Sequence, residues 1–121
     1  MDDPADPGPA QDLEHPIPRL DALDTVVTHE RGAYVGIVIA SPLRDDPLSR
    51  ARLLRKIEVT LQYFQSPEFT KRCGQPTPQR CKVYISVHSG SDPAMIDLVE
   101  DCRARISEVG ATPVISLTHV N

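Results

Sequence analysis

Two histidines and an aspartate near the ends of predicted strands are the side chains best placed to do chemistry. His88 ends one predicted strand, Asp92 follows it after a short turn, and His119 closes the last predicted strand. In open sheets of parallel strands, ligands bind outside the carboxyl ends of the strands. Imidazole and carboxylate groups gathered there bind divalent metals or transfer protons. We therefore take His88, Asp92 and His119 as candidate ligand-binding residues.

Sequence motifs for catalysis or cofactor binding do not support this placement. The chain has no HxH or HExxH spacing, no GxSxG turn, no CxxC pair and no glycine-rich phosphate loop. Ser89-Gly90-Ser91 precedes a predicted helix start, but Asp92 at that start would repel an anion. We predict no catalytic residue, no metal ligand and no cofactor, and the balance favours a protein that is not an enzyme.

The three cysteines indicate a reducing compartment. An odd number of cysteines, with an acidic, proline-rich start (MDDPADPGPA) where a secretion signal has basic and apolar regions, is typical of a cytoplasmic protein. Cys102 falls on the apolar face of a predicted helix and should be buried. Cys73 and Cys81 flank a loop and could pair if oxidised.

Charge is distributed unevenly along the 121 residues. The net charge is −4, yet residues 1–24 hold seven acidic residues and one arginine, Arg19. Residues 1–18 also hold five prolines, a composition that buries too little apolar surface to offset the entropy of ordering. We predict a disordered acidic tail over 1–18, either solvated or acting as a docking peptide, and a single domain over 19–121.

Hydrophobic periodicity predicts the elements of that domain. The predicted strands are 24–30 and 33–40, joined by a turn at Arg31-Gly32, then 80–88 and 113–120. The predicted helices start at Asp46-Pro47 and at Asp92-Pro93, with Asp as the N-cap and Pro as the first helical residue. The first runs to Gln65 with Leu54 in its buried stripe, and Gly110 ends the second.

The order β-β-α-β-α-β predicts an α/β fold on the border of α+β. Right-handed crossovers that move in the same direction place both helices on one face of a four-stranded mixed sheet, giving a two-layer sandwich. A reversal of direction would cover both faces instead. The alternating strand 80–88 favours the first arrangement, which leaves Tyr84 on an uncovered face. That face is either a dimer or partner surface or a moderately polar solvent face.

Basic residues on the first helix form a second candidate surface. Arg52, Arg55 and Lys56 give this helix a positive character, and with Tyr84 they are the candidate partner-binding residues. They could meet an acidic protein, the chain's own tail or a nucleic acid, or form a solvated face. Aromatic residues are 4% of the chain with no tryptophan, so platforms for base stacking are few. A nucleic-acid partner is therefore not favoured, and the absence of a long apolar run argues against a membrane.

The order of elements over residues 21–119 resembles a family of small, uncharacterised bacterial proteins. The stretches that carry the resemblance are Leu23-Asp24-Thr25-Val26 at the hairpin and Leu61-Gln62-Tyr63-Phe64 near the end of the first helix. The resemblance implies a small bacterial cytosolic protein of unknown function and carries no site residues.

These observations favour a non-enzymatic protein-binding or regulatory module that binds a protein partner or forms a homodimer. One alternative is a small ligand-binding or metal-dependent enzyme domain with its site at the strand ends. A second is a nucleic-acid binder that uses the basic helix. They differ in the surface used: the open sheet face, the carboxyl edge of the sheet, or the helix.

Overall fold

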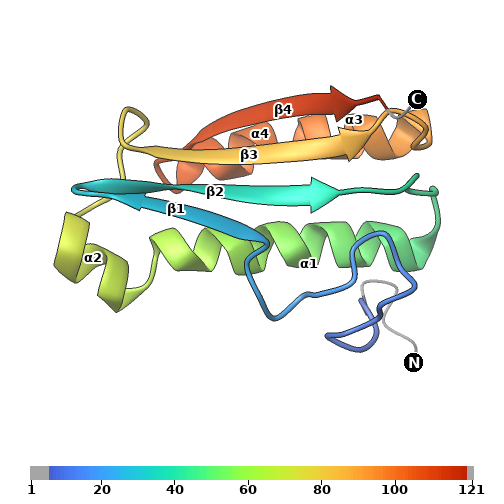
Figure 1. Ribbon diagram of the computed structural model, residues 1–121, viewed down its shortest axis with the longest axis horizontal. Helices are drawn as coiled ribbons and strands as arrows, with labels where there is room; N and C mark the ends of the chain where they lie inside the picture. Colours follow the sequence, from blue (N-terminus) through green and yellow to red (C-terminus); the bar gives the residue numbers. More distant parts are fainter. Residues whose placement is uncertain (1–5, 120–121) are drawn as a thin grey trace.

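The computed structural model describes residues 6–119 and shows a four-stranded sheet in the order β1-β2-β3-β4 (Figure 1). β1 (Thr25–His29) pairs antiparallel with β2 (Gly32–Ile39). β2, β3 (Cys81–His88) and β4 (Thr112–Thr118) are mutually parallel. The predicted mixed sheet and α/β class are confirmed.

The hairpin between β1 and β2 turns at Glu30 and Arg31, one residue earlier than predicted. Gly32 lies inside β2 opposite His29, and its φ is not positive. Its role is close approach, because a Cβ atom there would lie 2.1 Å from the carbonyl oxygen of Arg80. Glycine at this position therefore serves the packing of β2 against the chain entering β3.

The first helix, α1 (Pro47–Phe64), begins as predicted. The Asp46 carboxylate caps it by accepting a hydrogen bond from Ser49 N at 2.7 Å. Its buried stripe contains Leu53 at 0% exposure, whereas Leu54 is 44% exposed, so the predicted stripe was wrong by one position. Both residues suit a helical spacing from Ile57, which is why periodicity could not choose between them.

Helices also occupy the regions after α1 and after β3. A short helix, α2 (Pro67–Cys73), forms where a loop was predicted and buries Phe69 in the core. The second predicted helix is present as α3 (Pro93–Asp101) and α4 (Arg103–Glu108), which meet at Cys102. Gly110, with φ of 93°, follows α4 as predicted. β4 ends at Thr118, and Val120 of the predicted strand lies outside the described residues.

The helices α1, α3 and α4 form one layer on one face of the sheet. Alternate residues of β2 and β3 are buried and share a core with α1, α3 and α4, whereas the intervening side chains lie on the opposite face, which no helix covers. The two-layer sandwich is therefore confirmed, and one face of the sheet remains open. Within residues 6–119, no helix combines the length and apolarity needed to cross a membrane.

Candidate functional site

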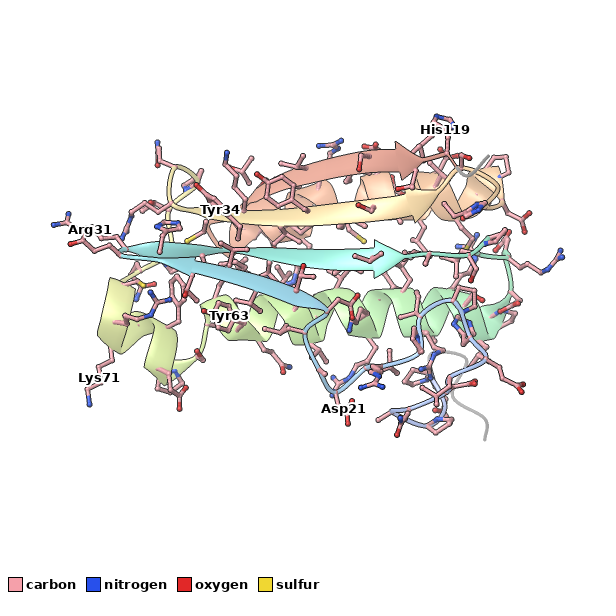
Figure 2. The ribbon with its side chains drawn as sticks, in the orientation of Figure 1. Asp21, Arg31, Tyr34, Tyr63, Lys71 and His119 are labelled. Atoms are coloured by element: carbon pink, nitrogen blue, oxygen red, sulfur yellow. The ribbon has the colours of Figure 1, made fainter. Side chains whose placement is uncertain are left out.

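The predicted site at the carboxyl edge of the sheet is only partly assembled. His88 ends β3 opposite Thr118 of β4, so His119 lies at the same edge (Figure 2). The His88 Nδ1 atom accepts a hydrogen bond from Gly90 N at 2.9 Å. Asp92 is turned away, because its Oδ2 atom accepts from Asp45 N at 2.7 Å instead of capping α3. His88 and Asp92 are therefore occupied by local hydrogen bonds, and His119 is exposed at the same edge.

Other carboxylates near this edge also hold local structure. Asp45 forms an ion pair with Arg50 at 2.6 Å, and Asp46 caps α1. In the described part of the chain, no three His, Cys, Asp or Glu side chains are grouped so as to hold a metal ion. The carboxyl edge therefore offers turn and cap contacts rather than a formed ligand site.

Two predicted partner-binding residues are buried. Arg52 is 0% exposed and Lys56 is 1% exposed, although both are cations on a helix. The Arg52 guanidinium donates to the carbonyl oxygens of Ile17 at 2.9 Å, Pro7 at 2.9 Å and Pro9 at 2.6 Å. These bonds satisfy carbonyls of the N-terminal segment, residues 6–24, which lies beside α1 (Figure 1).

Lys56 extends the same contact. Its ammonium group donates to the carbonyl oxygens of Arg19 and Ala22 at 2.7 and 2.5 Å and pairs with the Asp24 carboxylate at 2.8 Å. Charge-assisted bonds of this kind are about twice as strong as neutral ones. Of the surfaces considered for the basic helix, Arg52 and Lys56 therefore contact the chain's own N-terminal segment.

The N-terminal segment is placed differently from the tail expected over 1–18. Leu20 N donates to Ala10 O at 2.8 Å, which closes a tight loop, and Ile17 is buried at 2% exposure. Carbonyl groups need no apolar side chains in order to bind Arg52 and Lys56, so an acidic, proline-rich composition is compatible with these contacts. Residues 1–5 of the expected tail lie outside the described residues.

Of the three predicted basic residues of α1, Arg55 is the one that is exposed on the surface.

A second basic cluster, at the hairpin end of the sheet, binds the backbone of neighbouring segments. Arg72 donates to His29 O at 2.8 Å, and Arg80 donates to Arg31 O at 2.8 Å and Cys73 O at 3.0 Å. Their guanidinium groups bind backbone carbonyls, so the hairpin end keeps an excess of positive charge.

A cleft of about 260 Å³ separates the N-terminal segment from the start of α1. Sequence reasoning missed it because its residues fall in the expected tail and a loop. Its lining consists of Asp12, Glu14, His15, Pro16, Pro42, Arg44, Asp46 and Ser49. The one polar pair with catalytic residue types is His15 Nε2 and Ser49 Oγ, 3.0 Å apart.

The hydrogen bonds of His15 select a tautomer that cannot accept the proton of Ser49. Ile17 N donates to His15 Nδ1 at 2.9 Å, so Nδ1 carries no hydrogen and the neutral ring carries its hydrogen on Nε2. Nε2 then donates to Ser49, whereas a general base must accept the serine proton. The pair therefore fastens the N-terminal segment to α1.

Burial makes Cys102 a poor candidate for a reactive thiol. Cys102 is buried as predicted, and burial raises the pKa of its thiol to about 11. A thiol with so high a pKa is a poor nucleophile at neutral pH. Cys73 and Cys81 are unpaired in this structure.

The open face of the sheet has an unusual composition for a protein surface. Among the strand residues on this face, Lys82 is the only one that is lysine, arginine, aspartate or glutamate. The face consists of Thr25, Val27, His29, Gly32, Tyr34, Gly36, Val38, Lys82, Tyr84, Ser86, His88, Thr112, Val114, Ser116 and Thr118. Depletion of charge together with aromatic residues is the pattern of the core of a protein interface.

Aromatic and aliphatic side chains cluster on β1, β2 and β3 of this face. The rings of Tyr34 and Tyr84 lie 6.1 Å apart edge to face, and Lys82 Nζ lies 5.5 Å from the centre of the Tyr34 ring. Tyr84 is 39% exposed, Val38 is 48% exposed and Val27 is 60% exposed. These contacts fix the side chains in place while leaving apolar surface accessible.

Comparisons with known proteins assign this chain to no family. No family model, no curated protein and no solved structure matches it. The resemblance to small bacterial proteins therefore stays a prediction, and the functional argument depends on the described surfaces alone.

The Arg52 contacts lead to a prediction about proteolysis. Arg52→Met removes the donor to three carbonyls of the N-terminal segment, so this segment should detach more often and expose the bond after Arg19 to trypsin. We expect cleavage there to be about tenfold faster or more, because a bond to a charged group contributes about 1.5–3 kcal/mol. The matched control is Arg55→Met on the exposed side of α1. Equal cleavage rates in the two variants would contradict the assigned role of Arg52.

His15 leads to a prediction about pH. Burial and the nearby Arg52 charge lower the pKa of His15 below its usual 6.5, against the opposing effect of Asp12 and Asp46. A proton on Nδ1 would also face the Ile17 N–H, so the folded state favours neutral His15. Its contribution to stability is therefore full above pH 6.5 and is lost as the pH falls below that value.

Urea denaturation between about pH 7.5 and about pH 5 measures this contribution. His15→Gln should lose less stability on acidification than the unmodified chain, whereas His119→Gln, at an exposed position, should match it. An unchanged pH dependence in His15→Gln would contradict the role given to His15.

Proposed function

We propose that this protein is a non-enzymatic protein-binding module whose contact surface is the open face of the sheet. The observation that carries the proposal is the charge depletion of this face, where Lys82 is the single fully charged residue among the strand positions. Charged residues make up 25% of the whole chain. A surface kept free of charge next to exposed Tyr84 and Val38 supports contact with another protein rather than with water alone.

The other candidate surfaces offer less support. At the carboxyl edge His88 and Asp92 accept hydrogen bonds from nearby backbone N–H groups, and Arg52 and Lys56 are buried under the N-terminal segment. We propose a cytoplasmic location as part of the same function, since three unpaired cysteines suit a reducing compartment.

Photo-crosslinking in the cells of origin tests this proposal. A photoreactive phenylalanine analogue at position 84 replaces an exposed tyrosine with a ring of similar size. The same analogue at position 54, on the exposed side of α1, serves as the matched control. We expect a protein adduct from position 84 and none from position 54, because only the first position lies on the open face.

The mass of the adduct separates the possible partners. A doubled mass would identify a second copy of this chain, and any other mass would identify a different protein. The absence of a protein adduct at position 84, or equal adducts at both positions, would overturn the proposal.

A further inference from the structure

We propose that residues 6–16 form a strap that closes over α1 while His15 is neutral and detaches from α1 when His15 is protonated. Residues 17–24 stay in place, so Ile17 is the hinge. The strap lies on the helical layer (Figure 1), so this inference is independent of the open face.

Burial divides the N-terminal segment into an outer and an inner part. The inner part places Ile17 and Leu20 in the core, at 2% and 4% exposure. In the outer part, residues 6–16, no side chain is buried, and Leu13 is 67% exposed. Apolar contacts therefore hold the inner part against the helical layer, whereas the outer part depends on polar contacts.

Two side chains of α1 hold the outer part. Arg52 Nη1 donates to the carbonyl oxygens of Pro7 and Pro9 at 2.9 and 2.6 Å. Ser49 Oγ lies 3.0 Å from His15 Nε2. These contacts fasten the strap at two points along α1.

Two backbone hydrogen bonds join the outer part to the inner part. Leu20 N donates to Ala10 O, and Asp12 N donates to Pro18 O, both at 2.8 Å. Ala10 is exposed, and Asp12 and Pro18 are partly exposed. Water can replace these bonds at small net cost, so the strap can open once its contacts with α1 weaken.

The Arg52 contact is incomplete in the closed form. Arg52 is 0% exposed, and its Nη2 atom has no acceptor among the described residues. A buried donor without an acceptor is unfavourable, and more so when it is charged. Opening admits water to the guanidinium group, which offsets part of the loss of the Pro7 and Pro9 contacts. The two forms are therefore closer in free energy than the count of hydrogen bonds suggests.

Protonation of His15 removes a contact at the hinge itself. His15 Nδ1 accepts a hydrogen bond from Ile17 N at 2.9 Å. A proton on Nδ1 turns this acceptor into a donor that faces the Ile17 N–H. The ring can then satisfy its new donor only by leaving this position.

The charges near His15 come from the strap, from the chain that precedes α1 and from α1 itself. They are Asp12, Glu14, Arg44, Asp46 and Arg52. Burial and the Arg52 charge disfavour the protonated ring, against the opposing effect of Asp12 and Asp46, and the pKa of His15 lies below its usual 6.5. Protonation therefore favours the open form, in which the ring is hydrated and farther from Arg52.

Opening changes the surface that α1 presents. Once Pro7 and Pro9 withdraw, the Arg52 guanidinium group faces solvent beside Arg55, which is exposed one turn further along the helix. The open form therefore exposes both arginines, whereas the closed form exposes only Arg55 of the two.

Backbone order parameters of the full chain, measured by NMR relaxation, test the strap. Those of Ala10 and Leu13 should fall from about 0.85 at about pH 7.5 to below about 0.6 at about pH 5. Those of Leu20 and Ile57 should stay near about 0.85 at both pH values. Order parameters of Ala10 and Leu13 that do not change with pH overturn the proposal, and so does an equal loss of order at Leu20.

Two variants assign the response to His15. His15→Asn keeps an acceptor for the N–H group two residues along but does not titrate, so its strap should show no response to pH. His119→Gln removes an exposed histidine and should keep the full response. A pH response in His15→Asn equal to that of the unmodified chain overturns the role of His15. Circular dichroism at both pH values confirms that each variant retains the fold.

Discussion

One-sided coverage of the sheet is the constraint on which the rest of this structure depends. The connections from β2 to β3 and from β3 to β4 step in the same direction, so α1, α3 and α4 all lie on one face. That face carries the buried apolar residues of β2 and β3, which form the core with the helices. The other face has no helix to cover it, so its side chains remain free for contacts outside the chain. The absence of carboxylates among the strand residues of this face is the basis of the proposed protein-binding function.

The N-terminal segment completes the helical layer by a different kind of interaction. Arg52 and Lys56 are buried cations that bind backbone carbonyls, with one carboxylate, Asp24, for the pair. Burial of a cation is unfavourable unless its donors find acceptors. Backbone carbonyls of the segment supply most of these acceptors, and Arg52 Nη2 is the buried donor that has none among the described residues. An acidic, proline-rich sequence can therefore be held against α1, with Ile17 and Leu20 inserted into the core.

Local sequence signals predicted much of the fold, but they did not predict which polar side chains are buried or which groups they contact. The Asp46-Pro47 and Asp92-Pro93 starts, the alternation in β3 and the stop at Gly110 predicted the elements and the two layers. Arg52, Arg55 and Lys56 belong to one basic helix, and nothing in their spacing shows that two of them are buried. Their acceptors are carbonyls more than thirty residues away along the chain, and a sequence carries no sign of such bonds. Likewise, the candidate edge residues are of suitable types, but the contact of Asp92 with Asp45 N depends on loop geometry that periodicity does not report.

The most direct test of the open face as a contact surface compares the backbone amide chemical shifts of the full chain in its cells of origin with those of the purified chain in dilute solution. The account predicts that the largest shift changes fall on Tyr34, Val38, Tyr84 and Ser86, in the two central strands, while the amides of α1 stay constant. Shift changes confined to α1 or to the N-terminal segment would contradict it. Identical chemical shifts in the two settings would contradict it as well.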